Sequence, residues 1–367
     1  MLRNMASIRE RVRKDGTTVW AVLWRDADSG KQTSRSMATW QDALELRDFL
    51  NANGQSFALA AQAASRLRST ADAVATVVGA HIEGLTAVTD GTRHRYRKLA
   101  QRHITGASIG PIPVDTLTRQ DVASWLNGLP LAVKSKRNVH SLLSAALTQA
   151  VRDGVIPTNV AHGARFPRST TRREPVFLTR EEVALIANAV PARYSPLVHF
   201  LAGTGLRWSE ATALRVRDVD TSRERGSVSV TRAWKEAKRG WVVGAPKTAR
   251  GRRTVSMPAA VTALVRGVAG ERGRDDLLFT APQGGPVWNH EFHKAVWQPM
   301  LRDLEDQLRA APRIHDLRHT HASWLIAAGV PLTVIQRRLG HESIKTTSDT
   351  YGHLADDADQ AAAAALD

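Results

Sequence analysis

The sequence has no cysteine. This absence excludes disulfide bonds, catalysis by a thiolate and zinc sites with cysteine ligands, and it fits a reducing compartment such as the cytosol. Long apolar runs are absent too: no stretch approaches the roughly 18 residues that a membrane-spanning helix needs. Residues 1–9 lack the apolar core of a signal peptide. We therefore expect a soluble intracellular protein that does not interact with membranes.

Acidic residues are few compared with basic ones. The chain has 35 Asp and Glu against 51 Lys and Arg, which gives a formal charge of +16 and an isoelectric point near 10.9. Such an excess indicates a polyanionic partner, nucleic acid before a membrane surface, although a basic protein without such a partner is an alternative. The 367 residues, 43% of them hydrophobic, suffice for two or three domains of roughly 150 residues each.

Residues 1–54 are predicted to form a three-stranded sheet with one helix. Polar and apolar residues alternate through residues 17–24, and Asp-Gly and Asp-Ser-Gly turn sequences lie on either side. Residues 39–52 carry apolar side chains at helical spacing. The Ala-rich residues 55–70 are predicted to be a helical coupler or linker rather than a packed layer.

Helical periodicity predicts an all-helical domain of four or five helices over residues 71–165. Thr118 precedes one periodic run and is the expected N-cap of its helix, and another helix should extend from about Ala132 to a stop at Gly154. Residues 166–176 contain two prolines and several arginines without apolar periodicity. They are predicted to be an interdomain linker that lies along DNA.

Residues 177–354 are predicted to form a last domain of mixed α and β structure. Its first helix should begin at a capping pattern that pairs Thr179 with Glu182. The tail, residues 355–367, is expected to be a short helix or a frayed end. The expected fold is therefore multidomain and mainly α, with small β-sheets.

Branched or alternating residues predict strands over residues 227–231, 241–243 and 253–257. The arginine-rich segment between the last two is predicted to join them as a hairpin. Lys247 would then lie at a strand end, and its ammonium could reach and protonate a leaving oxygen. A hairpin that is basic only for solubility is an equal alternative from this segment alone.

A glycine-containing turn is predicted within residues 201–214. Gly203 and Gly205 permit a tight connection between two helices, so Arg207 would open the second helix, where main-chain amides favour an anion. Glu210 follows at helical spacing and could hold this arginine in place. The segment lacks the third glycine and the preceding strand of a dinucleotide site, and an exposed arginine without function is the alternative.

A histidine-rich helix is predicted from residue 315 onward. His315, Arg318 and His319 can share one helical face, and a guanidinium beside an imidazole suits a phosphate group. Two histidines four residues apart also suggest zinc. However, Asp316 replaces the glutamate of the His-Glu-x-x-His motif and Arg318 would repel a cation, so no metal is expected.

The last predicted helices end near Tyr351. Pro331 can start a short helix that Gly340 ends in a way that exposes His341, and a second short helix then carries Tyr351. A tyrosine in this position is usually a packing residue. Its hydroxyl becomes a useful nucleophile when neighbouring groups favour the ionised form or neutralise the group under attack. The cationic segments upstream supply such groups.

Together these segments resemble the tyrosine recombinases, specifically the integrases of bacteriophages and related mobile elements. The resemblance covers nearly the whole chain and rests on Gly-Thr-Gly-Leu-Arg-x-x-Glu, Pro-Lys-Thr, His-Asp-Leu-Arg-His, Leu-Gly-His and Asp-Thr-Tyr-Gly-His. The helical domain resembles the family's core-binding, SAM-like domain and the N-terminal sheet its arm-binding domain. The catalytic residues that the resemblance implies are Arg207, Lys247, His315, Arg318, His341 and Tyr351, supported by Glu210.

The family resemblance also implies roles for these residues. Tyr351 would attack a phosphodiester and form a 3′-phosphotyrosyl link without a metal or nucleotide cofactor. Arg207 and Arg318, helped by His341, would offset the charge of the phosphate oxygens. His315 would accept the tyrosine proton and Lys247 would protonate the leaving 5′ oxygen.

The implied activity is integration or excision of a phage or mobile element at double-stranded DNA attachment sites, by a homotetramer, in the cytoplasm of a bacterial host. An excision directionality factor and a host DNA-bending protein are possible partners. A type IB topoisomerase, which religates the same strand, and a non-catalytic DNA-binding protein derived from a recombinase are the alternatives. Phosphate contacts are predicted for Arg95, Arg97, Lys98, Lys134, Lys136, Arg137, Arg250 and Arg252, with solvated helix faces as the alternative.

Overall fold

The computed structural model describes residues 5–167, 174–237, 240–246, 249–270 and 272–351. The chain divides into two compact units, Met1–Thr170 and Thr171–Asp367, and each is described by itself below. The expected multidomain, mainly α fold with small antiparallel sheets is confirmed. Within the described ranges, no helix combines the length and apolar character that a membrane span requires. The predicted tail, residues 355–367, lies outside the described residues.

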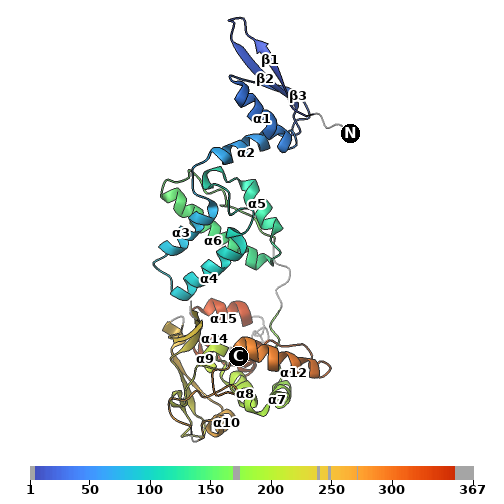
Figure 1. Ribbon diagram of the computed structural model, residues 1–367. Helices are drawn as coiled ribbons and strands as arrows, with labels where there is room; N and C mark the ends of the chain where they lie inside the picture. The colour runs from blue at the N-terminus through green and yellow to red at the C-terminus, as the bar shows by residue number, and fades with distance from the viewer. Residues whose placement is uncertain (1–4, 168–173, 238–239, 247–248, 271, 352–367) are drawn as a thin grey trace, which may run out of the picture. The chain divides into compact units, whose positions relative to one another are not determined.

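The first unit begins with the predicted three-stranded sheet and helix (Figure 1). Its antiparallel strands, in the order β1-β2-β3, are β1 (Ser7–Val12), β2 (Thr18–Arg25) and β3 (Gln32–Met37). Helix α1 (Trp40–Ala52) begins at the N-cap Thr39 and packs Ala43 and Leu50 against Val22 and Trp24 of β2. The alternation and the turn sequences therefore predicted this part correctly.

Helix α2 (Phe57–Arg68) corrects one prediction. It is helical as expected, but it is not an unpacked coupler, because Phe57 and Ala60 belong to the same core as the sheet. The ring of Phe57 stacks on Trp24 with centroids 5.7 Å apart. The small alanine side chains that suggested a linker allow one face of α2 to pack against α1.

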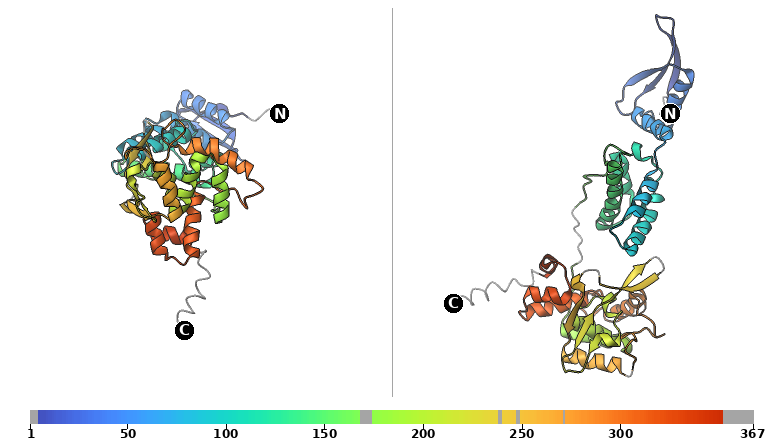
Figure 2. Two further views of the ribbon diagram at one scale, coloured as in Figure 1. Left: turned by 90° about the horizontal axis from the view of Figure 1, so that it is seen from below. Right: turned by 90° about the vertical axis from the view of Figure 1, so that its left-hand side faces the viewer.

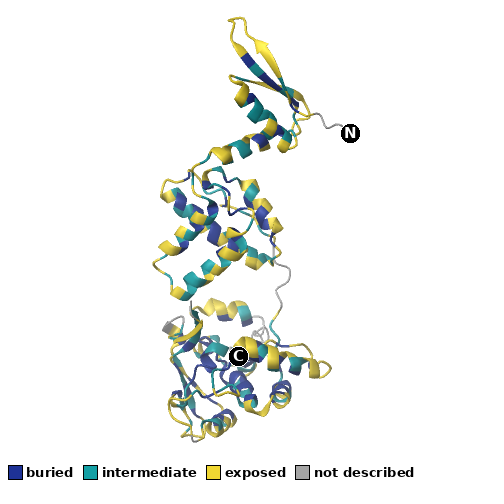
Figure 3. Ribbon diagram, in the orientation of Figure 1, coloured by how far each residue is buried: buried dark blue, intermediate teal, exposed yellow. Residues whose placement is uncertain are grey.

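The rest of the first unit is helical. Its helices are α3 (Val74–Gly84), α4 (Asp90–Ala100), α5 (Arg119–Gly128) and α6 (Val133–Arg152), with a π-helical turn η1 (Gln101–Thr105) after α4 and a 3₁₀ turn η2 (Val114–Thr116). The apolar side of α6, including Leu143 and Leu147, packs in one core with α3 (Figure 3). Thr118 forms a complete capping box with Asp121 at the start of α5, as its N-cap prediction requires.

The second unit is built around helix α8, whose apolar residues are almost all buried. Its α-helices are α7 (Arg180–Ala189), α8 (Ser195–Thr204), α9 (Trp208–Ala211), α10 (Ala259–Ala269), α11 (Asn289–Phe292), α12 (Gln298–Asp303), α13 (Asp316–Ala327), α14 (Leu332–Leu339) and α15 (Ile344–Tyr351). Shorter helical turns are η3 (Ala192–Tyr194), η4 (Val216–Asp218), η5 (Ala249–Gly251) and η6 (His293–Trp297). Helices α7, α10 and α13 contact α8 directly, and Thr179 and Glu182 form the predicted capping box of α7.

The strands of this unit correct the predicted hairpin. One sheet has the order β4-β5-β8, and a separate hairpin pairs β6 with β7. Figure 2 draws the strands of this unit in yellow. The strands are β4 (Val219–Asp220), β5 (Ser227–Val230), β6 (Ala233–Ala237), β7 (Gly240–Gly244) and β8 (Arg253–Ser256). The strands predicted over 241–243 and 253–257 therefore do not pair. Trp234 and Trp241 of the β6–β7 hairpin instead pack on Trp288, with centroids 5.0 and 5.7 Å from its ring.

Candidate active site

The turn that ends α8 places Arg207. Gly205 caps α8 in the left-handed region with φ of 67°, and a Cβ there would lie 2.6 Å from Cδ2 of His321 and 2.9 Å from Cδ2 of Leu339. Both the backbone conformation and the close packing therefore require glycine. Arg207 follows as the N-cap of the four-residue helix α9, which confirms the predicted start of a helix.

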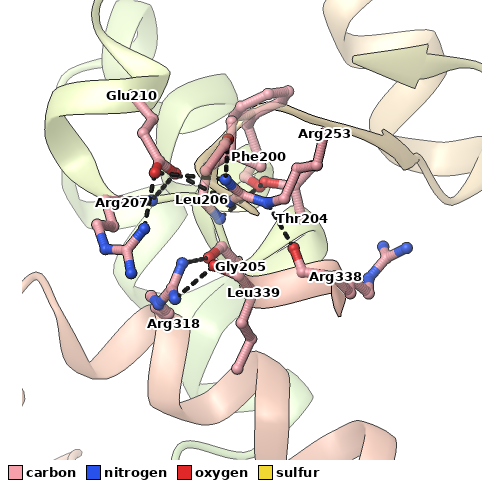
Figure 4. Close-up of polar contacts among 11 residues, drawn as sticks. Phe200, Thr204, Gly205, Leu206, Arg207, Glu210, Arg253, Arg318, Arg338 and Leu339 are labelled. Atoms are coloured by element: carbon pink, nitrogen blue, oxygen red, sulfur yellow. Dashed lines mark hydrogen bonds and ion pairs between the residues drawn. The ribbon is translucent and has the colours of Figure 1, made fainter. Parts of the chain in front are cut away.

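Glu210 holds two arginines (Figure 4). Its side chain is buried and accepts hydrogen bonds from the Arg207 main-chain nitrogen at 3.0 Å and Nη1 at 2.8 Å. Arg253 of β8 donates to the same carboxylate through Nη2 at 2.9 Å and Nη1 at 3.3 Å. Burial acts to raise the pKa of Glu210, but the hydrogen bond and charge of Arg253, together with Arg207, outweigh it and lower the pKa. A carboxylate thus fixes the guanidinium of Arg207, whose side chain remains 39% exposed.

Arg318 of α13 is held by the main chain. It is only 2% exposed and donates from Nη1 to the Gly205 carbonyl at 2.6 Å and from Nη2 to the Leu339 carbonyl at 2.7 Å (Figure 4). These oxygens lie at the C-terminal ends of α8 and α14, where helix dipoles favour a cation. Burial and the charge of Arg207 lower the pKa of Arg318 to about 9, so the guanidinium stays charged at neutral pH.

Tyr351 is docked against α13. The residue is 1% exposed and packs with Ala322, Ile335 and Leu339. Its hydroxyl forms a hydrogen bond with Nδ1 of His319 at 2.8 Å. Burial raises the pKa of Tyr351 to about 12, against the opposing charge of Arg318, so the phenol is neutral.

His315 and His319 lie one helical turn apart, as predicted. His315 is the N-cap of α13, and its ring meets that of His319 edge-to-face with centroids 5.0 Å apart. Burial of the His315 ring, with the charges of Arg318 and His319, lowers the pKa of His315 below its ordinary value. His315 is therefore neutral at pH 7, and it lies one ring away from the tyrosine hydroxyl.

His341 follows Gly340, which ends α14 in the left-handed conformation as predicted. The side chain is half-buried rather than exposed, because α15 folds back beside it and the Thr347 hydroxyl lies 2.9 Å from Nδ1. Burial and the charges of Arg318 and Arg207 lower the pKa of His341 to about 3. The imidazole is therefore a neutral hydrogen-bonding group.

The described part of the site thus combines two fixed guanidiniums, three histidines and a buried tyrosine in one unit. Lys247 lies outside the described residues. Two arginines beside neutral imidazoles and a phenol suit a phosphodiester, whose non-bridging oxygens accept charged hydrogen bonds.

Residues 176–358 match the model of the phage integrase family. The chain belongs to this family of tyrosine recombinases. A curated relative, the putative prophage phiRv2 integrase of Mycobacterium tuberculosis, is 29% identical to the recombinase over 285 residues, which cover 76% of this chain and 74% of the relative.

Two sets of solved structures share the fold of the recombinase. The Tn1549 transposon integrase in complex with a circular intermediate DNA superposes with a TM-score of 0.70 at 22% identity, covering 80% of this chain and 99% of that chain. A lambda integrase tetramer bound to a Holliday junction superposes with a TM-score of 0.56 at 18% identity, covering 91% of this chain and 95% of that one.

Arg253, His321 and Arg338 were not singled out in the sequence, although they position the site of the recombinase. His321 is buried, its Nδ1 lies 2.8 Å from the Ala202 carbonyl, and Nε2 accepts a hydrogen bond from Nε of Arg338 at 2.8 Å. Arg338 also donates to the Ser256 carbonyl of β8 at 2.8 Å. Arg253 lies two residues before the buried Val255 in β8, so strand alternation was a usable signal that both side chains face inward.

The predicted DNA-binding residues lie in both units of the recombinase. On α4, Arg95 and Lys98 are exposed and line a groove with Asn138 of α6, whereas Arg97 is bound by both oxygens of Glu83 at 2.7 and 2.6 Å. The remaining candidates are exposed or half-buried, and they are Lys134, Lys136, Arg137, Arg250 and Arg252. Arg137 and Arg250 each donate to a main-chain carbonyl. DNA contact by these residues stays a prediction.

Proposed function

We propose that this tyrosine recombinase cleaves and rejoins double-stranded DNA at specific sites, with Tyr351 as the nucleophile. One observation carries the assignment: the buried hydroxyl of Tyr351 is hydrogen-bonded to His319. The same unit fixes Arg207 through the carboxylate of Glu210 and Arg318 through main-chain carbonyl groups. A packing tyrosine would need no such array of proton-transfer and cationic groups.

The proposed reaction needs no cofactor. The Tyr351 oxygen attacks the phosphorus, the bond to the 5′ oxygen breaks, and a 3′-phosphotyrosyl link conserves the bond energy. Arg207 and Arg318 hold the non-bridging oxygens, and His341 donates a further hydrogen bond. Lys247 protonates the leaving 5′ oxygen, and a 5′ hydroxyl from a partner strand then reverses the attack.

The proposed assembly follows the likeness to lambda integrase, which has been solved as a tetramer on a Holliday junction. We propose that four protomers act on two duplexes to integrate or excise a mobile element, in the cytoplasm of a bacterial host. An excision directionality factor and a host DNA-bending protein remain predicted partners. The basic groove of α4 and α6 supports phosphate contacts outside the catalytic unit.

The direct test is Tyr351→Phe on a suicide substrate, which is nicked so that the short fragment with the newly formed 5′ hydroxyl diffuses away after cleavage. We expect unchanged DNA binding and no covalent protein–DNA band on a denaturing gel. Tyr194→Phe is the matched control, because Tyr194 is also a buried tyrosine of this unit, and it should keep the band. A band that survives in Tyr351→Phe would refute the assignment.

The same substrates separate the alternative functions. Joined products from two distinct duplexes indicate recombination, whereas relaxation of supercoils without joined products indicates a type IB topoisomerase. A wild-type chain that binds DNA but forms no adduct would indicate a non-catalytic DNA-binding protein.

A further inference from the structure

We infer that His319, rather than His315, accepts the proton of Tyr351 when the tyrosine attacks the phosphate. The inference rests on the function proposed above. A proton acceptor must lie within hydrogen-bond reach of the proton that it takes. Nδ1 of His319 meets this requirement, since it lies 2.8 Å from the hydroxyl oxygen.

The surroundings of the hydroxyl make a direct acceptor necessary. The tyrosine ring is buried between α13 and α14, and burial raises the pKa of Tyr351 to about 12. Such a phenol is almost fully protonated at neutral pH. Its proton must therefore leave during the attack, toward a base already in contact.

His315 does not contact the tyrosine hydroxyl directly but contacts the ring of His319. Its ring touches His319 edge-to-face, at a centroid distance of 5.0 Å, while the ring of His319 lies 5.6 Å from that of Tyr351. The order of the rings is thus His315, His319, Tyr351. His315, at the N-cap of α13, is available to contact the phosphate or to orient His319.

The proton and bond changes balance in both directions. In cleavage, the hydroxyl proton moves to Nδ1 of His319, whose Nε2 carries the other proton, while the Tyr351 oxygen bonds to phosphorus and the bond to the 5′ oxygen breaks. In rejoining, a 5′ hydroxyl attacks, the phenolate leaves and His319 returns its proton.

Two substitutions separate proton transfer from mere docking of the tyrosine. In His319→Asn, the carboxamide occupies the place of Nδ1 and keeps a hydrogen bond to the hydroxyl, but it cannot accept a proton at neutral pH. His319→Ala removes both functions. We expect both variants to lose about 10²- to 10⁴-fold in single-turnover adduct formation, the range typical of a general base. His315→Asn should lose less, and His290→Asn, an exposed histidine of the same unit, should match the wild type.

A second readout distinguishes a base from a structural support. Imidazole added to His319→Ala should restore adduct formation, and rescue by substituted imidazoles should rise with their pKa, which a purely structural role would not produce. If His319→Ala does not fold, as judged by DNA binding and circular dichroism, the shape-conserving His319→Asn variant carries the test.

The possible outcomes separate this inference from the proposed function. Near wild-type adduct formation by His319→Asn, or a larger loss in His315→Asn, would overturn the assignment to His319 while leaving Tyr351 as the nucleophile. Absence of an adduct in the wild-type chain would refute the proposed function itself, and the assignment to His319 with it.

Discussion

Replacing Arg253 by methionine should destabilise the second unit strongly. The side chain of Arg253 is 7% exposed and donates two hydrogen bonds to Glu210, one to the Arg338 carbonyl at 2.7 Å and one to the Gly251 carbonyl at 3.0 Å. Methionine fills much of the volume but leaves the buried Glu210 with Arg207 alone. Losing one partner of a buried ion pair costs about 3–5 kcal/mol. Because Arg207 still pairs with Glu210, we expect the lower end, about 3 kcal/mol.

Arg217→Met is the matched control. Arg217 also pairs with a carboxylate of the second unit, Asp275, but its side chain is 42% exposed and that of Asp275 is 65% exposed. An exposed pair contributes about 0–1 kcal/mol. The two variants thus remove the same functional group from an Arg–carboxylate pair and differ mainly in burial.

The assay is hydrogen exchange by mass spectrometry in increasing urea, followed in peptides from α9 and α14 so that the second unit is read by itself. With a slope of about 2 kcal/mol per molar urea, a loss of about 3 kcal/mol lowers the unfolding midpoint by roughly 1.5 M. Arg217→Met should shift it by at most about 0.5 M. Equal shifts in the two variants would refute the view that Glu210 needs both arginines.

Two further predictions concern Gly205 and His321, which pack against each other. Gly205→Ala should lower the free energy of unfolding by about 3 kcal/mol, because it combines left-handed backbone strain with close contacts to His321 and Leu339. The control is Gly284→Ala, since Gly284 also has a positive φ, 83°, but has open space around it. This variant should lose only about 1 kcal/mol in the same urea series. Burial and the charge of Arg338 lower the pKa of His321 to about 3 in the folded chain. As the pH falls, His321 therefore becomes protonated in the unfolded chain before it does so in the folded chain. The contribution of His321 to the free energy of unfolding should be fully present above pH 6.5 and fall between pH 6.5 and about 3, by up to about 1.4 kcal/mol per pH unit. His321→Asn should remove this contribution to the slope. A wild-type slope no steeper than that of the variant would contradict the shift.

Features decided by neighbours in the sequence were predictable. The capping pairs at Thr118 and Thr179, the stop at Gly340 and the strands of residues 17–24 depend on side chains only a few residues apart. The recombinase motifs were recognisable for the same reason, since each lies within one short segment. The structure places those within the described residues in a single unit.

Features decided by distant packing were not predictable. Strand β6 lacks clear alternation, so its pairing with β7 depends on contact of both strands with Trp288, far along the chain. The choice between His315 and His319 as the partner of the tyrosine depends on how α15 returns to α13, which spacing along a helix does not determine. The α2 packing was missed because an Ala-rich composition is equally compatible with a free helix and a closely packed one.

The two arginines of the site differ in how much sequence variation they tolerate. Arg207 depends on the chemical identity of Glu210, so a substitution at that one position releases it. Arg318 is oriented by the peptide oxygens of residues 205 and 339, which every amino acid carries. Apart from the steric demand at Gly205, its orientation should persist through side-chain changes at these positions. A recombinase of this design can therefore exchange Leu339 for another apolar residue and keep a correctly aimed guanidinium.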